Sequence, residues 1–290
     1  MSFTVQPCAK HLGAEISGVD LSRAIDTETF AKIDQTYAKY GVIFFRNQDF
    51  SPDQQISFSG RFGEVGSFPL AQYSLDGHPE ILLVSNIQKD NVNIGLADAG
   101  QTWHTDMSWS ALPPRGTALY AKEIPINNDD DVFGDTLFAS ASAAYEALPD
   151  ALKNRIEGLK AIHSYHAKHA YRAKVSVSDR EEMSQDQKDA HPNVVHPVVR
   201  THPLTGRKCL YVVTGECVGI EGMPENEALA LLDELATHTV KPEFQYRHKW
   251  QVGDFLMWDN CSVQHLAIRD YELPLRRLMH RTQFAGSRPY

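Results

Sequence analysis

The segment WHTDMSW (103–109) places a histidine and an aspartate two residues apart, with tryptophans at both ends. In a β-strand, residues two apart point to the same face and lie roughly 6.6 Å apart along the chain. His104 and Asp106 could therefore converge on one ion, and a carboxylate is tolerated in apolar surroundings when it ligates a cation. Taken alone, the short motif is better explained by a packed histidine beside a turn-forming aspartate.

A metal site would need a further ligand from a distant segment. Two histidines and one carboxylate around open coordination positions are the usual ligands of non-haem Fe(II) oxygenases. Among the 13 histidines, His265 is the best candidate, because it follows the apolar stretch FLMWDN and lies in a segment that is neither helical nor charged. The other histidines lie in polar segments, beside prolines or at packing positions.

A second pattern is the basic segment RRLMHR (276–281). Period-two alternation places Arg277, Met279 and Arg281 on one face of a strand. If that face is interior, its guanidinium groups need anions, because unpaired buried charge is costly and arginine binds carboxylates through paired hydrogen bonds. The alternative is a solvent-facing strand with scattered basic residues.

Composition limits the class of protein. The 290 residues suffice for one large domain or two small ones, and the net charge of −9 argues against a broad nucleic-acid-binding surface. The four cysteines form no CxxC pair, which favours free thiols in a reducing compartment. We find no signal peptide and no apolar run of about 18 residues, so we expect a cytoplasmic protein without a membrane partner.

The elements that must position these residues are mostly short strands. Their number, with few helices and no βα alternation, predicts an antiparallel sandwich or barrel with external helices. Residues 166–195 are polar and read as a loop or lid, and the acidic segment 127–135 as a solvated loop rather than a second metal site. We expect helices over 27–40 (N-cap Thr27), 51–63 (capping box Ser51 and Gln54) and 224–240 (burying Leu229, Leu232 and Leu235), and strands within 208–215, 244–260 (two, around a Gly-Asp turn) and 276–286.

Together these segments resemble the Fe(II)- and 2-oxoglutarate-dependent dioxygenases of the taurine dioxygenase and aryloxyalkanoate dioxygenase group. The resemblance implies a single domain over residues 1–290, mainly β with flanking helices, around a double-stranded β-helix (jelly-roll, cupin-like) core. The polar segment 166–195 would be an insertion or lid in this domain. The matching segments are LGAEISGVDLS (12–22), YGVIFFRNQ (40–48), RFGEV (61–65), WHTDMSW, GDTLFAS (134–140), HPVVRTHPLTG (196–206), WDNCSVQH and RRLMHR.

The resemblance also implies roles for individual residues. His104, Asp106 and His265 match the ligands that hold Fe(II). Arg277 matches the arginine that pairs with the distal carboxylate of 2-oxoglutarate, and Thr136 matches the threonine that hydrogen-bonds the same cosubstrate.

Other matches concern the substrate. Arg281 matches the arginine that holds the substrate anion in taurine dioxygenase, and Met107 matches a position whose backbone amide touches substrate. Where the taurine enzyme has a histidine, an asparagine and an aromatic residue, this chain has Phe68, Gly100 and the segment TGECVGI (214–220). These differences argue against taurine. The aromatic residues that could line a larger apolar pocket are Phe68, Tyr73, Trp109 and Tyr165.

The sequence thus predicts a dioxygenase that uses Fe(II), 2-oxoglutarate and O2 to hydroxylate an unactivated C–H bond of a small anionic substrate, a carboxylate, sulfonate or sulfate ester. Succinate and CO2 would be released, and hydroxylation beside a heteroatom would lead to oxidative cleavage. We also expect a homo-oligomer, a dimer or a tetramer. Two alternatives stay open: a zinc hydrolase with the same three ligands, in which the arginine pair and Thr136 would lack a purpose, and a metal-free jelly-roll binding module, against which the intact ligand set argues.

Overall fold

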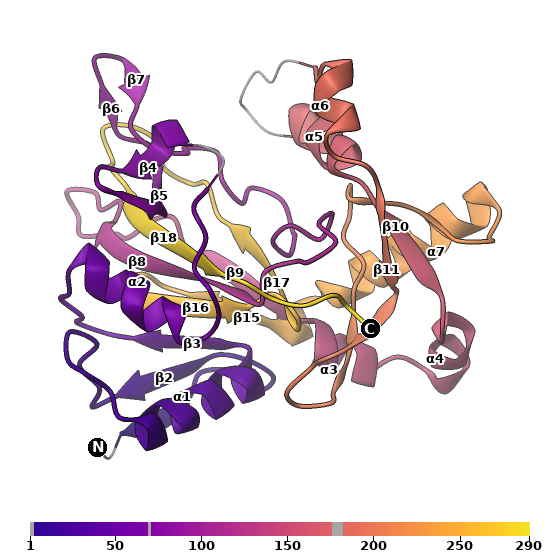
Figure 1. Cartoon of the computed structure of the whole chain (residues 1–290), viewed down its shortest axis with the longest axis horizontal. Helices are drawn as coiled ribbons and strands as arrows, with labels where there is room; N and C mark the ends of the chain where they lie inside the picture. Colours follow the sequence, from indigo (N-terminus) through magenta and orange to yellow (C-terminus); the bar gives the residue numbers. More distant parts are fainter. Residues whose placement is uncertain (1–2, 69–70, 176–181) are drawn as a thin grey trace.

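The largest element is an eight-stranded sheet with the strand order β1-β2-β3-β16-β8-β18-β5-β4 (Figure 1). The computed structural model describes residues 3–68, 71–175 and 182–290. Neighbouring strands are antiparallel except for β2 and β3, which run parallel. The strands span Thr4–Pro7 (β1), Ala14–Ser17 (β2), Val42–Phe45 (β3), Phe255–Asp259 (β16), Gly116–Glu123 (β8), Leu278–Phe284 (β18), His78–Ser85 (β5) and Ser74–Leu75 (β4).

A smaller antiparallel sheet of three strands, ordered β15-β9-β17, faces the large one. It comprises Gln245–His248 (β15), Thr136–Ser140 (β9) and Val263–Ala267 (β17). One apolar cluster takes side chains from both sheets; Phe138 of β9 and Trp258 of β16 lie with ring centroids 5.9 Å apart. Two sheets packed face to face are the mainly β, jelly-roll arrangement that the sequence predicts.

Helices α1 (Thr27–Tyr40) and α2 (Pro52–Gly60) cover the other face of the large sheet. Strand β16 shows how both faces are filled. Phe255 and Met257 pack toward these helices, whereas Leu256 and Trp258 pack toward the small sheet, as the period of two requires. A strand buried on both faces appears in the sequence as the continuous apolar run FLMW.

A third apolar cluster holds the right-hand part of the molecule in Figure 1. It combines helices with two small sheets, ordered β11-β10-β14 and β12-β13. No helix in the described ranges is both long enough and apolar enough to span a membrane. Apart from two helices within 165–189, described below, the remaining elements are α3 (Ala141–Glu146), α4 (Asp150–Ile156), α7 (Glu225–Thr239), β10 (Lys160–His163), β11 (Val194–Pro197), β14 (Cys217–Ile220), β12 (Val199–Thr201), β13 (Lys208–Leu210), the hairpin β6 (Gln88–Lys89) and β7 (Val92–Asn93), and the short 3-10 helices η1 (Ala71–Tyr73) and η2 (Pro242–Phe244).

Three details of the predicted helices are wrong. The N-cap of α1 is Asp26, not Thr27, because the Asp26 carboxylate accepts the Thr29 backbone N–H at 2.8 Å. In α7, Leu229 is 43% exposed, and Leu231 takes the buried place beside Leu232 and Leu235. The capping box of α2 is confirmed, with the Ser51 N–H donating to the Gln54 side chain at 2.7 Å. That helix ends at Gly60, three residues before the predicted boundary.

The two strands predicted within 244–260 are confirmed as β15 and β16, with Gly253 and Asp254 in the turn between them. They do not pair with each other, because β15 joins β9 whereas β16 joins β3 and β8. The chain therefore crosses from one sheet to the other at this turn.

The segment predicted as a loop over 166–195 is largely helical, which corrects that prediction. It forms α5 (Tyr165–Val175) and α6 (Gln185–Asp189), and residues 176–181 between them lie outside the described ranges. No residue of helix α5 is fully buried. The helix is attached to the rest of the molecule by side-chain ion pairs, Lys168 with Glu216 and Arg172 with Asp98. Whether this segment acts as a lid stays a prediction.

Candidate active site

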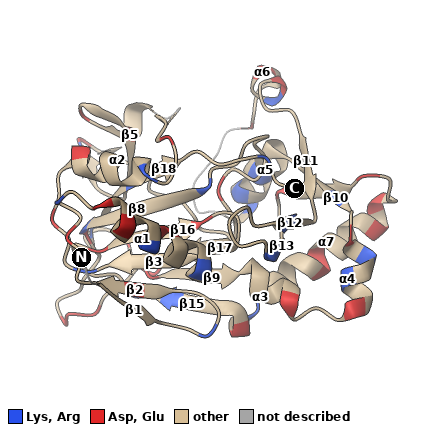
Figure 2. Ribbon diagram, turned by 60° about the horizontal axis from the view of Figure 1, so that its bottom comes forward, with Lys and Arg blue, Asp and Glu red and all other residues tan. Residues whose placement is uncertain are grey.

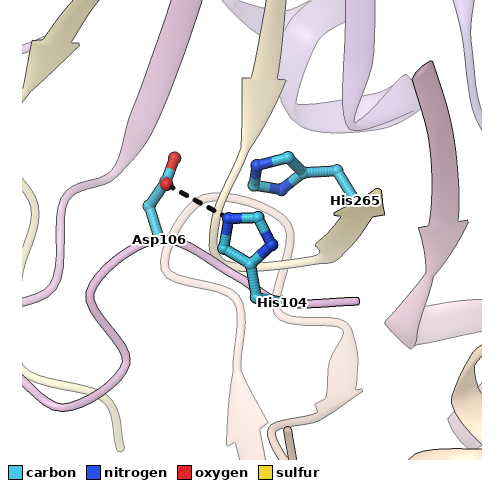
Figure 3. A group of neighbouring side chains, drawn as sticks. All are labelled: His104, Asp106 and His265. Carbon is cyan, nitrogen blue, oxygen red and sulfur yellow. Dashed lines mark ion pairs between the residues drawn. The ribbon is translucent and has the colours of Figure 1, made fainter. Parts of the chain in front are cut away.

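The structure brings His104, Asp106 and His265 together (Figure 3). One potential ligand atom from each lies within 4.8 Å of the other two, and all three residues are buried. His104 Nε2 is 3.8 Å from Asp106 Oδ1, and the two imidazole centroids are 4.1 Å apart. Among the described residues this is the one such group of His, Cys, Asp or Glu side chains.

The predicted reason for this convergence is wrong in detail. His104 belongs to an isolated bridge with His265, in which the backbone N–H of each residue donates to the carbonyl of the other, at 3.1 and 2.8 Å. Asp106 begins a turn, and Met107 takes the left-handed conformation with φ of 50°. The bridge and the turn, rather than strand alternation, therefore set the relative positions of the three side chains.

Neighbouring groups orient each side chain. His104 Nδ1 lies 2.8 Å from the Thr102 carbonyl oxygen, to which it donates, so the lone pair of His104 is on Nε2. The Thr117 hydroxyl donates to Asp106 Oδ2 at 2.6 Å. Such hydrogen bonds are typical around metal ligands, because they hold the tautomer and the direction of each donor atom.

The electrostatics favour the protonation states that bind a cation. Burial lowers the pKa of His104 to about 3 and that of His265 to about 4, so both imidazoles are neutral at pH 7. Burial alone would raise the pKa of the Asp106 carboxyl, but the Arg281 guanidinium and the two imidazoles hold it well below its usual range. His265 Nδ1 is buried and has no hydrogen-bond partner among the described residues. Two neutral imidazoles and one carboxylate fit a divalent transition metal.

Arg277 is buried without a carboxylate partner among the residues that the structure describes. Its guanidinium donates to the Gly134 carbonyl, lies 5.7 Å from the Trp250 ring centroid and leaves Nε unpaired. Trp250 Nε1 donates to the Thr136 hydroxyl at 3.0 Å, so the same indole contacts both predicted cosubstrate residues. A buried guanidinium with free donors suits an added carboxylate.

Arg281 has different surroundings. Its Nη2 is 2.7 Å from Asp106 Oδ1, and its guanidinium lies 5.7 Å from the Phe68 ring centroid. A register shift between Leu278 and Met279 interrupts the predicted alternation, so Arg277 precedes the regular part of β18. Both arginines nevertheless point inward.

A cavity of about 600 Å³ opens beside the triad. Of the predicted substrate residues, Phe68, Met107, Trp109, Tyr165 and Arg281 line it. Tyr73, at the end of η1, is not among the described residues that do.

Sequence reasoning missed seven further lining residues with polar side chains: Glu64, Ser67, Thr102, Lys168, Arg172, His191 and Gln283. Two of them lie on α5. Their spacing from Tyr165, three and seven residues, is that of one helical face, but the sequence did not predict a helix here. The acidic segment 127–135 is an exposed loop at its centre, as predicted.

Comparison with known proteins agrees with this geometry. Residues 4–283 match the family described as "Taurine catabolism dioxygenase TauD, TfdA family". The chain belongs to the TauD/TfdA family. It is a mainly β, jelly-roll enzyme of the 2-oxoglutarate-dependent dioxygenase class, and this membership disfavours the hydrolase and the binding module.

Individual TauD/TfdA relatives are similar over nearly their full lengths. The alpha-ketoglutarate-dependent 2,4-dichlorophenoxyacetate dioxygenase of Cupriavidus pinatubonensis is 34% identical, with 97% of each chain covered. The alpha-ketoglutarate-dependent sulfate ester dioxygenase of Pseudomonas putida is 31% identical, with 100% of this chain and 91% of the relative covered. The structure of AAD-2 in complex with Mn(II) and N-oxalylglycine is 29% identical, covers 100% of this chain and 99% of that chain, and aligns with a TM-score of 0.81.

Proposed function

We propose that this protein uses Fe(II), 2-oxoglutarate and O2 to hydroxylate an unactivated C–H bond of a small organic anion, with release of succinate and CO2. The observation that carries the proposal is the buried triad of His104, Asp106 and His265 beside a cavity lined by Arg281. Cytoplasmic location and a dimeric or tetrameric assembly stay predictions from the sequence.

His104 Nε2, His265 and the Asp106 carboxylate would hold the metal. When bound, the ion supplies O2 activation and the oxidising power for C–H cleavage. The protein keeps both imidazoles neutral by burial and fixes the carboxylate through Thr117. Asp106 would itself be a ligand, at the position that a halide would otherwise take, which supports hydroxylation.

Arg277 and Thr136 would bind 2-oxoglutarate. The buried guanidinium has no carboxylate partner in the described part of the chain, so an incoming carboxylate would compensate its charge. The Thr136 hydroxyl accepts from Trp250 and keeps its own proton for donation to the cosubstrate.

The substrate would carry a carboxylate, sulfate or sulfonate head group toward Arg281 and an apolar or aromatic body against the cavity wall. Trp109 and Tyr165 lie with ring centroids 4.5 Å apart, and His191 is 4.5 Å from Tyr165. Flat rings of this kind suit a planar or aliphatic body. The named substrates of two relatives, 2,4-dichlorophenoxyacetate and sulfate esters, combine an acid with such a body. Phe68 and Gly100 at two taurine-contact positions disfavour taurine.

The test begins with anaerobic protein, Fe(II) and 2-oxoglutarate, which should give a weak visible charge-transfer band. Succinate release is then measured in air with aryloxyacetates, alkyl sulfates and alkyl sulfonates. Asp106→Ala should lose the band and the turnover, whereas Asp129→Ala, in the exposed acidic loop, should keep both. Folded wild-type protein without the band, or unchanged turnover in Asp106→Ala, would contradict the proposal.

A further inference from the structure

Lys168 on α5 is an ionisable group in the cavity that the proposed function does not use. Its spacing places it on one helical face with Tyr165 and Arg172, and all three line the cavity. The helix carries Lys and Arg but no Asp or Glu (Figure 2). The cavity therefore has two cationic side chains on α5, separate from Arg281 on β18. Arg172 is paired with Asp98 at 3.3 Å, which leaves Lys168 as the candidate to consider.

Glu216 holds the Lys168 ammonium in place. Lys168 Nζ is 2.8 Å from Glu216 Oε1, and the exposed fractions of the two side chains are 15% and 3%. The Ser108 hydroxyl donates to Glu216 Oε2 at 2.6 Å, and Ser108 lies two residues after Asp106. The backbone N–H of Ser164 also donates to the Glu216 carbonyl at 2.8 Å. The start of α5 and the turn that bears Asp106 are thus joined through one buried acid.

This arrangement leaves hydrogen-bonding capacity on Lys168. An ammonium group has three donors, and Glu216 is its one carboxylate partner among the described residues. Lys168 lines the same cavity as His104 and Asp106, which places the ammonium near the triad. A contribution to folding stability is a weak explanation for this ion pair, because well-packed apolar residues at the same two positions usually stabilise a fold at least as much.

We propose that Lys168 is a second specificity-determining cation of this cavity, and that the preferred substrate carries two anionic or acceptor groups, one for Arg281 and one for Lys168. The inference rests on the proposed function and deepens it. Recognition at two points would orient the substrate body between α5 and β18 and so select which C–H bond faces the metal. Glu216 acts as a positioning residue for Lys168.

Binding to protein that holds Mn(II) and N-oxalylglycine tests this without turnover. The probes are phenoxyacetate and its three ring-carboxylated isomers, followed by quenching of tryptophan fluorescence or by calorimetry. The best ring-carboxylated isomer should bind the wild type about 10- to 100-fold more tightly than phenoxyacetate, as expected for one charge-assisted hydrogen bond. Lys168→Met should abolish this preference while keeping the affinity for phenoxyacetate, and Lys168→Arg should retain the preference.

The matched control is Lys174→Met, which removes an exposed lysine from the same helix and should behave as wild type. The double variant Lys168→Met with Glu216→Gln leaves no unpaired buried charge and should also lose the preference, so a folding defect of the single variant does not decide the test. The inference is overturned if wild type binds no ring-carboxylated isomer more tightly than phenoxyacetate. It is also overturned if Lys168→Met weakens all four compounds equally. Binding of phenoxyacetate that depends on Arg281 reports separately on the proposed function.

Discussion

Arg277 and Arg281 lie four residues apart, yet different groups compensate their charges. Arg281 is paired with Asp106 at 2.7 Å, whereas Arg277 has backbone and aromatic neighbours, and its Nε has no hydrogen-bond partner within residues 3–68, 71–175 and 182–290. A buried cation without an acid needs an anion from outside the chain. This difference supports assigning the constant partner, 2-oxoglutarate, to Arg277 and the variable partner, the substrate, to Arg281.

Arg277→Ala should therefore raise the 2-oxoglutarate concentration required for turnover with every substrate. Truncating one partner of a buried, hydrogen-bonded charge pair costs about 2–5 kcal/mol, which is roughly 30-fold or more in KM. Arg281→Ala should instead affect turnover in proportion to how strongly the substrate head group is charged. Steady-state succinate formation against 2-oxoglutarate and against each substrate measures both effects.

Arg276→Ala is the control, because that side chain is 54% exposed and pairs with Glu123 at the surface. Its kinetic constants should match those of wild type. Equal effects of Arg277→Ala and Arg281→Ala across all head groups would refute this division of roles.

At this scale, residue types and motif spacing were sufficient to select the triad and both arginines. Lys168 could not be selected in the same way, because its partner Glu216 is 48 positions away and only the fold brings them to 2.8 Å. The same holds for the aromatic contact between Trp109 and His191. A polar stretch shows that charges are present but not which of them face inward.

At the scale of elements, the turn before β9 determines where the Arg277 guanidinium can lie. Gly134 has φ of +74°, and a Cβ at this position would come within 2.5 Å of Arg277 Nη1 and 2.8 Å of the Tyr271 ring. Only glycine combines this backbone conformation with so close an approach. The Arg277 guanidinium also donates a hydrogen bond to the Gly134 carbonyl, and this bond helps to hold it in place.

Gly134→Ala should thus displace Arg277 and raise the KM for 2-oxoglutarate, about tenfold or more, without removing any charged residue. Gly222→Ala is the matched control, because Gly222 has φ of +73° and no atom within 4 Å of the added Cβ. Both variants introduce similar backbone strain, so a comparable loss of thermal stability is expected in each. If the KM for 2-oxoglutarate rises equally in both, strain rather than the contact with Arg277 is responsible.

The elements that sequence patterns predicted best are those with a regular apolar period or an uninterrupted apolar run. Strand β16 is buried along its whole length, as its run FLMW indicates, and α7 buries Leu232 and Leu235 on one face. Helix α5 has no apolar stripe, since its inward positions are Tyr165, Lys168 and Arg172, and it was therefore predicted as a loop. The bridge between His104 and His265 joins positions 161 residues apart and leaves no local pattern.

At the scale of the whole molecule, a buried hydrogen bond links the β12-β13 sheet to the large sheet. His202 Nε2 donates to Asp259 Oδ2 at 2.6 Å, and the exposed fractions of the two side chains are 3% and 1%. His202 Nδ1 accepts the backbone N–H groups of Leu204 and Thr205, each at 3.1 Å, so the ring proton is on Nε2. Asp259, at the end of β16, is thereby held beside the segment that carries Arg200.

This pair predicts how stability depends on pH. Burial alone would raise the pKa of Asp259, but the hydrogen bond from His202, with smaller contributions from the Cys261 backbone N–H and the Arg115 charge, lowers that pKa in the folded state. A depressed carboxyl pKa contributes stability that is complete above the unfolded value, about 3.9, and is lost as pH falls through the folded value.

His202→Ala should lower the unfolding temperature by about 2–5 °C near pH 6, and the difference from wild type should shrink as pH falls below about 4. Calorimetric scans from pH 6 to pH 3 measure this difference in unfolding temperature. The control is His238→Ala, which removes a hydrogen bond to the Ala144 carbonyl rather than to a carboxylate. A difference between wild type and His202→Ala that is unchanged or larger at pH 3 would show that His202 stabilises the molecule by packing and not through the Asp259 carboxylate.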